Sequence, residues 1–531
     1  MDIKWWQKGV FYQIFLRSFK DSNDDGIGDL PGLISKIDYL SDLGVDAITI
    51  TPFFPSPYYD SGFDVSDYFA VDNKLGTIAD LVQLIDKLHT NNIKIVIEIP
   101  INHTSIEHAW FKESALSKDN EFSDFYIWSD QIPNNWISNF EGKAWTYHPT
   151  RKQYYMHSLS KKIPDLNWRC EALVCKMLEV FKYYLELGVD GLSLGCINLI
   201  IKDRDLRDNP KYPGTFFNNY LKQRHIFDRN RPFLHKVIRR VRSLVDSYED
   251  KVLIGDVVVA PPGEPELVAS LYGMYKDELN LAYDYSIANT TIIPKTFRAA
   301  SKRWIEACDT SWPSWVLSSH DHKRLLTKFG GNIEKTRLAT MFLMTQRGTP
   351  LIYYGEELGL ENAFVSKREQ KDLQRKQWFF FQNSRDGSRS PMLWDNSAYA
   401  GFSNVKPYLP QDNIKKCVIN QQEKDVSMYK YCKKFIALRK KHEALVEGDM
   451  SFVDINDENI IAYIRTTNRE TLLVLLNFSR KKRIINLNDI ELPFITKTSI
   501  FSTNPLAKCP DYNKKGIFLQ GYEGAIYSID I

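Results

Sequence analysis

The sequence predicts an α/β protein built on a (β/α)8 TIM barrel, with a subdomain inserted into the barrel and an antiparallel β domain after it. Short apolar runs rich in β-branched residues recur eight times, and segments with helical periodicity lie between them. Continuous apolar strands of this kind are typical of a parallel sheet that is covered on both faces. Near the C-terminal end the helical pattern stops and alternating segments take over.

Eight predicted strands define the barrel. In chain order they are GVFYQIFLRSF, VDAITITPFF, KIVIEIPIN, VDGLSLGCI, KVLIGDVVV, LNLAYDYS, SWVLSSHDH and GTPLIYYGEEL. Residues 80–90 (DLVQLIDKLHT) show the helical period between two of them. Residues 104–188 are richer in Trp, Tyr, Asn and Pro than a crossover helix requires, so the first part is predicted to be an insertion. After about Glu447, IIAYIRT and LLVLLNF predict antiparallel strands.

Composition excludes several classes of protein. The 531 residues include 69 Lys and Arg against 66 Asp and Glu, so a net charge of +3 provides no field for nucleic acid or an anionic membrane. The longest basic run, residues 480–483, is interpreted as a solvated loop or strand end. No transmembrane segment and no secretory signal are expected. Seven cysteines at scattered spacing predict reduced thiols and a cytoplasmic location.

Polar side chains follow several of the predicted strands. In a barrel the chemistry lies at the carboxyl ends of the strands, so these residues are expected to converge. They are Asp60 and Asp64 after the second strand, Asn102 and His103 after the third, Asp256 at the fifth, and His320, Asp321 and His322 at the seventh. Carboxylates and imidazoles beside aromatic rings suit a sugar site, because carboxylates accept from hydroxyls and rings stack on pyranose faces.

A longer series of motifs carries a family resemblance over nearly the whole chain. In order they are FYQIFLRSFKDSNDDGIGDLPG, SPYYDSGFDVSDY, INHTS, IPDLNW, GVDGLSLG, HIFDRNRP, VLIGDV, SSHD, RGTPLIYYGEELG, RDGSRSPMLWD and AGFS. The chain resembles the α-amylase superfamily, glycoside hydrolase family 13, of the α-glucosidase and oligo-1,6-glucosidase type. The resemblance implies a barrel in two parts, 1–103 and 168–446, with domain B inserted at 104–167 and a C-terminal β-sandwich at 447–531.

The resemblance also implies catalytic roles, and here the family pattern is broken. Family members retain the anomeric configuration by using an Asp nucleophile and a Glu acid/base about 5–5.5 Å apart. A further Asp holds the 2- and 3-hydroxyls, and an Arg orients the nucleophile. In this chain the nucleophile position is Gly195, the Arg position is Ser193, the acid/base position is Asp256, and the further Asp is Asp321. Glu98 stands where the family has Asp near the end of the third strand.

Residues that hold the sugar are largely kept under the same resemblance. Asp60 and Arg385 match the pair that clamps the non-reducing glucose, and His103 and His320 match the hydroxyl donors. Phe63 replaces a stacking Tyr, which keeps the ring and loses the hydroxyl. The alternative interpretation is that these are remnants of the barrel rim, with their hydrogen bonds satisfied inside the protein. A small α-glucoside or glucose is the expected ligand.

The loop at residues 21–29 (DSNDDGIGD) is a candidate metal site. Oxygen-bearing side chains alternate along it, with Gly at the sixth position for the turn, as in the first half of an EF-hand loop. The resemblance implies structural Ca²⁺, with Mg²⁺ as an alternative, held by Asp21, Asn23, Asp25, Asp29 and the backbone oxygen of Ile27. A turn without metal is the other interpretation.

Two classes of function stay open at this stage. Glycine offers no atom that attacks carbon, and Asp203 and Asp205 lie too far along the chain to replace it. Loss of the Asp and the Arg together leaves a neutral pocket rather than an unpaired buried charge. We therefore expect a sugar-binding or partner-binding pseudoenzyme, with the protein partner unidentified. The alternative is an impaired or unusual retaining α-glucosidase or transglycosidase that acts on short α-glucosides.

Overall fold

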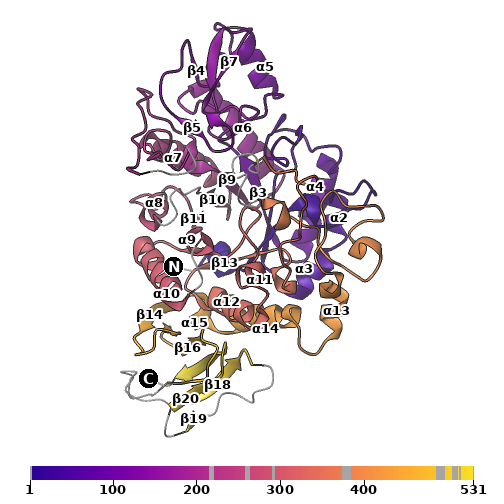
Figure 1. Ribbon diagram of the computed structural model, residues 1–531, viewed down its shortest axis with the longest axis vertical. Helices are drawn as coiled ribbons and strands as arrows, with labels where there is room; N and C mark the ends of the chain where they lie inside the picture. The colour runs from indigo at the N-terminus through magenta and orange to yellow at the C-terminus, as the bar shows by residue number, and fades with distance from the viewer. Residues whose placement is uncertain are drawn as a thin grey trace.

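The computed structural model has three parts arranged in a row (Figure 1). It describes residues 3–214, 220–257, 264–289, 293–373, 384–485, 497–504, 512–513 and 516–529. A barrel occupies the middle, the small strands β4 and β7 lie at one end of the molecule, and the C-terminal strands β18 to β20 lie at the other. The predicted fold class is confirmed by this arrangement.

Eight parallel strands form the barrel sheet, in the hydrogen-bonded order β11-β10-β9-β3-β2-β1-β13-β12. Each predicted apolar run contains one of them. Their bounds are β1 (Phe11–Ile14), β2 (Ala47–Ile50), β3 (Lys94–Pro100), β9 (Gly191–Gly195), β10 (Val252–Asp256), β11 (Leu281–Tyr283), β12 (Ser314–Val316) and β13 (Thr349–Tyr353). Nearly every residue of these strands is buried, which explains why the runs are continuously apolar.

Helices connect and cover the strands, and α4 (Ile78–Thr90) shows why they form. Thr77 caps its first turn together with Asp80, each side chain accepting from the other residue's backbone N–H. Leu81, Leu84 and Leu88 recur at helical spacing on its buried face. The other helices are α1 (Trp5–Lys8), α2 (Leu30–Ile34), α3 (Ile37–Leu43), α5 (Ala109–Leu116), α6 (Glu171–Glu186), α7 (Phe233–Val245), α8 (Pro265–Ser270), α9 (Ser286–Asn289), α10 (Pro294–Cys308), α11 (Leu325–Lys328), α12 (Ile333–Thr345), α13 (Val418–Glu423), α14 (Met428–Lys441) and α15 (Glu443–Val446).

The inserted segment follows β3 and carries its own small sheets. Its strands are β4 (Trp128–Ser129), β5 (Ile137–Ser138), β6 (Gly142–Lys143), β7 (Trp145–His148) and β8 (Gln153–Met156). Two contacts hold it against the barrel mouth. Asp165 pairs with His103 in a β-bridge, and its buried carboxylate lies 2.8 Å from the buried Lys202 ammonium. Domain B therefore stands directly beside the carboxyl ends of β3 and β9.

The C-terminal part is antiparallel. One sheet has the order β14-β15-β16-β21-β18 and the other the order β17-β20-β19. Their bounds are β14 (Asp449–Val453), β15 (Ile460–Thr466), β16 (Thr471–Asn477), β17 (Arg483–Ile485), β18 (Lys497–Ser502), β19 (Tyr512–Asn513), β20 (Gly516–Leu519) and β21 (Gly524–Ile529). Leu473 and Leu475 of the first sheet share a buried cluster with Ile517 and Leu519 of the second, as expected of a sandwich. The domain boundaries predicted from the sequence stay predictions.

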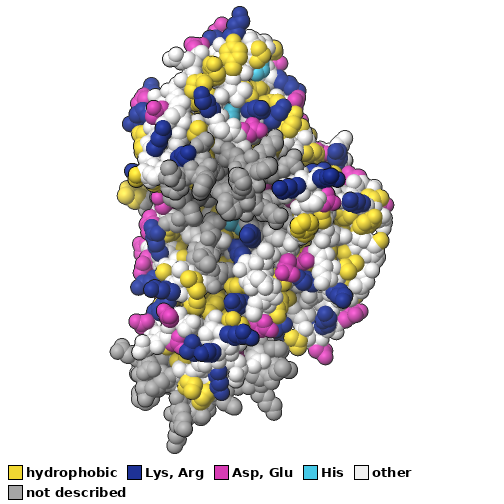
Figure 2. Space-filling model, viewed as in Figure 1, with side chains coloured by type: hydrophobic (Ala, Val, Ile, Leu, Met, Phe, Trp, Pro, Cys, Tyr) yellow, Lys and Arg dark blue, Asp and Glu magenta, His cyan; other side chains and the backbone are white. Residues whose placement is uncertain are grey.

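The charge of the surface is mixed, in agreement with the nearly equal numbers of basic and acidic residues. Figure 2 shows Lys and Arg interspersed with Asp and Glu over the coloured part of one face, without a large area of a single sign. Within the described ranges, no helix has the length and apolar character needed to cross a membrane.

Candidate sugar-binding site

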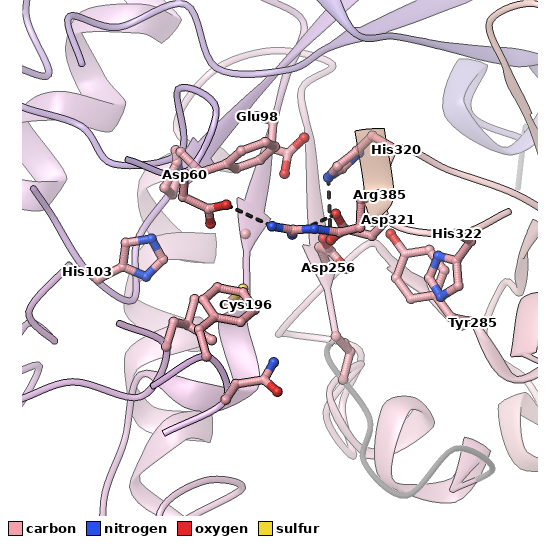
Figure 3. Close-up of a pocket in the computed structure, with 17 residues that line it drawn as sticks. Asp60, Glu98, His103, Cys196, Asp256, Tyr285, His320, Asp321, His322 and Arg385 are labelled. Carbon is pink, nitrogen blue, oxygen red and sulfur yellow. Dashed lines mark hydrogen bonds and ion pairs between the residues drawn. The ribbon is translucent and has the colours of Figure 1, made fainter. Parts of the chain in front are cut away.

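A cavity of about 200 Å³ opens at the carboxyl ends of the barrel strands. Figure 3 shows its polar side chains pointing toward one another from several strands and loops. The lining residues that the sequence predicts are Asp60, Phe63, His103, Gly195, Asp256, His320, Asp321 and Arg385. Ser193, two residues before Gly195 on β9, is buried and does not line the cavity. The structure therefore brings together nearly all of the predicted sugar-site residues.

A charged cluster around Arg385 forms one side of the cavity. The guanidinium lies 2.8 Å from Asp60, 3.0 Å from Asp321 and 2.6 Å from Asp372. Arg389 adds a second cation, 2.7 Å from the same oxygen of Asp321. Apart from Asp321, whose side chain is 40% exposed, these groups are largely buried. The cluster sets two guanidinium groups among three carboxyl groups and holds Asp60 and Asp321 in place before any ligand arrives.

Position 195 is open. Gly195 ends β9, and its backbone pairs with Pro100 of β3, while Ser193 pairs with Glu98. A Cβ atom placed on Gly195 would lie 3.6 Å from the Ile99 oxygen, 3.6 Å from the Pro100 Cα and 3.7 Å from Glu98 Oε1. These are ordinary contact distances, so the described structure leaves room for a Cβ at position 195.

Two carboxyl groups on the cavity floor lack protein partners for one oxygen each. These oxygens are Oε2 of Glu98, which is 3% exposed, and Oδ1 of Asp256. Burial, followed by repulsion from Asp256 and Asp321, raises the pKa of Glu98 well above its usual value. Burial and the Asp321 charge raise the pKa of Asp256 to about 7. Both shifts favour the protonated carboxyl group, and Asp256 is divided between its two forms near neutral pH.

The raised pKa of Asp256 predicts a pH-dependent gain in stability for Asp256→Asn. An ordinary carboxyl has a pKa of 3.8, against about 7 here, so native stability falls as pH rises between these values. The amide removes this penalty, which is at most about 4 kcal/mol. We expect the variant to melt several degrees above the wild type at pH 8 and close to it at pH 4. Melting curves recorded at several pH values test this prediction, and Asp86→Asn, at an exposed position, is the control. An equal shift of the melting temperature at pH 4 and pH 8 contradicts the prediction.

The histidines of the site are neutral. Burial is the main cause, and it lowers the pKa of His103, of His320 to about 4, and of His322 to about 3. Nε2 of His103 and Nδ1 of His320 are buried and have no hydrogen-bond partner in the protein. Both nitrogens are thus available to a ligand hydroxyl, as donor or acceptor according to the tautomer.

Aromatic rings complete the walls. Phe63 stacks on His320, with ring centroids 5.1 Å apart, and Tyr285 stacks on His322 at 4.6 Å. Domain B supplies Asn139 and Phe140, and the Phe140 ring centroid lies 5.4 Å from the Arg385 guanidinium. Sequence reasoning did not find Asn139, Phe140 or Tyr285. The only signal for Asn139 and Phe140 was the aromatic- and Asn-rich composition of the insertion, and Tyr285 lies near the end of the predicted strand run LNLAYDYS without a mark of its own.

The candidate metal loop is folded by its own side chains. Asp21 accepts hydrogen bonds from the backbone N–H groups of Asn23, Asp24 and Gly26, and Asp29 accepts from those of Ser22 and Gly32. The oxygen-only donor set has the right chemistry for Ca²⁺. Among the described residues, no three His, Cys, Asp or Glu side chains converge as a metal site. Two of the predicted ligands are oxygens of Asn23 and Ile27, so the Ca²⁺ site stays a prediction. The calcium prediction is neither supported nor used by the site described above.

Comparison with known proteins agrees with the fold. Residues 13–448 match the alpha amylase catalytic domain, and residues 460–526 match the alpha-amylase SusG C-terminal domain. The oligo-1,6-glucosidase of Halalkalibacterium halodurans is 34% identical over 576 residues, covering 99% of both chains. That of Bacillus cereus is 35% identical, covering 92% of this chain and 93% of its own.

Solved structures give the same result. An alpha-glucosyl transfer enzyme, XgtA, superposes with a TM-score of 0.93 at 34% identity, and the trehalulose synthase MutB from Pseudomonas mesoacidophila with 0.90 at 29%; both alignments cover 100% of each chain. Variants of MutB have been solved in complex with glucose and with sucrose. The match over most of the chain, on a barrel whose mouth carries a carboxylate-rich cavity, places this chain in the α-amylase family, glycoside hydrolase family 13.

Proposed function

We propose that this protein binds glucose or a short α-glucoside in the barrel cavity and does not hydrolyse it at an enzymatic rate. One observation carries the proposal: the groups that hold a sugar converge on the cavity, while position 195 offers only glycine. A retaining glycosidase needs a carboxylate that attacks the anomeric carbon. Sugar binding without turnover is the outcome that this combination favours.

The polar and aromatic side chains that line the cavity match the chemistry of a pyranose. Asp60 and Asp321 present acceptor oxygens held by Arg385, and His103 and His320 present unpartnered ring nitrogens. Phe63 and Phe140 add apolar surface for the faces of the ring. The relatives named as oligo-1,6-glucosidases and the MutB complex with glucose support a glucose-type ligand. A paired assay, in which binding and glucose release are measured on one sample, tests the proposal.

An impaired glucosidase or transglycosidase is the second candidate. The observation that favours it is Asp256, whose pKa of about 7 leaves a proton available for a leaving group near neutral pH. Its side chain is one methylene shorter than the family's Glu, and misplacement by about 1 Å can cost about 100-fold in rate. This candidate predicts slow turnover that an external nucleophile accelerates.

A structural Ca²⁺ at residues 21–29 is a separate proposal. Burial, with repulsion from Asp21 as a smaller contribution, raises the pKa of Asp25 and of Asp29, so a cation among the three carboxylates would relieve an unfavourable arrangement. A metal bound only by the folded state contributes about 2.7 kcal/mol at 100 times its dissociation constant. We expect EDTA to lower the melting temperature by several degrees and added Ca²⁺ to restore it. An unchanged melting curve contradicts the proposal.

A cytoplasmic location is proposed from the cysteines. The six cysteines in the described part of the chain carry free thiols, and three of them are buried. Reduced thiols are typical of a reducing compartment. A protein partner of the pseudoenzyme stays a prediction.

A further inference from the structure

The space beside Gly195 is the least explained feature of the cavity. Three atoms border it at 3.6–3.7 Å from the site of a Cβ: the Ile99 oxygen, the Pro100 Cα and Glu98 Oε1. The backbone of Gly195 is not in the left-handed region, so the conformation itself does not require glycine. The space is therefore kept open by the residue type alone, and it opens into the cavity that Gly195 lines.

Glu98 lies along one side of this space. It stands on β3 two residues before Pro100, and its side chain reaches toward the end of β9. Oε2 of this side chain is buried without a hydrogen-bond partner. The other oxygen, Oε1, borders the Gly195 space and is the one that a group placed there would meet. Figure 3 shows the carboxyl group of Glu98 directed into the same cavity as His320 and Arg385.

The position of the space relative to a bound sugar follows from stereochemistry, and this step rests on the proposed function. A nucleophile in a retaining enzyme attacks opposite to the bond that breaks, so for an α-glucoside it faces the β side of the anomeric carbon. The Gly195 space is therefore on the β side, and Asp256 is on the α side. The β anomer of free glucose directs its equatorial 1-hydroxyl to the side where the nucleophile would otherwise be.

We propose that the cavity selects the β anomer of free glucose, with its 1-hydroxyl in the Gly195 space and hydrogen-bonded to the Glu98 carboxyl group. The hydroxyl lies beside Oε1 of Glu98 and occupies the space that a Cβ at position 195 would take. An α-glucoside lacks this hydroxyl, and its aglycone points toward Asp256. The same site thus binds a free hexose more tightly than an α-glucoside.

The surrounding charges leave the Glu98 carboxyl group available for this contact. Arg385 and Arg389 are engaged by Asp60, Asp321 and Asp372. Neither guanidinium forms an ion pair with Glu98 in the described structure, and the neighbouring Asp256 repels its charged form. A protonated carboxyl both donates to and accepts from a hydroxyl. Glu98 is thus equipped to hold the 1-hydroxyl without a counter-cation.

The binding of three sugars tests the selection of the β anomer separately from sugar binding itself. Glucose carries the 1-hydroxyl, 1,5-anhydroglucitol lacks it and is otherwise identical, and methyl α-glucoside carries only an α substituent. Calorimetry is expected to give a dissociation constant for glucose about tenfold below that for 1,5-anhydroglucitol. With [1-¹³C]glucose, the NMR signal of the β anomer is expected to broaden on binding and that of the α anomer to stay sharp.

Two variants test the geometry. Gly195→Ala fills the space at ordinary contact distances and is expected to fold normally; Glu98→Asp draws the carboxyl group back by one methylene. Both are expected to lose the preference for glucose over 1,5-anhydroglucitol and to keep the affinity for 1,5-anhydroglucitol. The exposed Glu113→Asp is the matched control and is expected to behave as the wild type.

The outcomes are distinguishable. Equal affinity for glucose and 1,5-anhydroglucitol, or broadening of the α signal, overturns the inference and leaves the proposed function standing. Retention of the preference in both variants overturns it as well. Failure of all three sugars to bind overturns the proposed function together with the inference.

Discussion

Purified protein is expected to hydrolyse nitrophenyl α-glucoside at least about 10⁴-fold more slowly than the roughly 10 per second of a typical enzyme. The reason is that Gly195 offers no nucleophile and Asp256 is set back by one methylene. Release of nitrophenol, followed over hours at high protein concentration, measures the rate. Addition of formate or azide, which fit beside Gly195, is expected to give at most slow turnover. Turnover near 10 per second without additives contradicts the expectation.

Restoring hydrolysis is expected to need four changes. Gly195→Asp alone places a new carboxyl group beside Glu98 Oε1, which lies 3.7 Å from the Cβ position, with no cation to balance it. Adding Ser193→Arg and Asp256→Glu restores the other family groups, but Glu98 still occupies the neighbouring space. We expect Glu98→Asp, added as the fourth change, to raise the rate of the triple variant by about 100-fold, because misplacement by about 1 Å has that effect. A triple variant as active as the quadruple variant contradicts this role of Glu98. If neither the triple nor the quadruple variant hydrolyses the substrate, the remaining defect is expected to lie in domain B.

Arg385→Met is expected to abolish sugar binding and to destabilise the protein. Arg385 pairs with Asp60, Asp321 and Asp372 within 3.0 Å, and its side chain is only 11% exposed. Removing one member of a buried ion pair costs about 3–5 kcal/mol, because the remaining charges are left without compensation. The expected result is a melting temperature lowered by several degrees and no measurable heat with glucose.

Two controls separate charge from shape at Arg385. Arg385→Lys keeps the charge and loses the planar fork, so an intermediate loss is expected. Arg303→Met removes an exposed guanidinium that pairs with Glu266, and an exposed pair contributes about 1 kcal/mol or less. If Arg385→Met melts like the wild type, the buried cluster is not what holds the site together.

The sequence predicts the barrel well, because the burial of the barrel strands leaves a direct mark on their residue types. Strands covered on both faces require continuous apolar residues, and each predicted run contains a strand. The site is predictable where a residue directly follows a strand, as His103 follows β3 and His320 follows β12. Asp372 and Arg389 are different, because they act through ion pairs across the cavity rim. No local pattern marks Asp372, and Arg389 lies within the RDGSRSPMLWD motif without any sign in the sequence of its pair with Asp321.

Glu98 shows what sequence reasoning misses. Its substitution for Asp is visible in the sequence, but its effect depends on the register between β3 and β9, which places its side chain beside the end of β9. The change of one methylene matters only because position 195 is glycine. The two departures from the family pattern therefore belong together in space, although 97 positions separate them in the sequence.

A titration of the protein with maltose in a calorimeter, with glucose quantified in the same cell afterwards, tests the central claim most directly. The cavity is expected to give a saturable heat of binding in the millimolar range, and Arg385→Met is expected to remove it. No more glucose is expected than in a control without protein. Release of glucose near 10 per second per molecule, or the absence of any binding heat, would contradict a cavity that holds sugar without cleaving it.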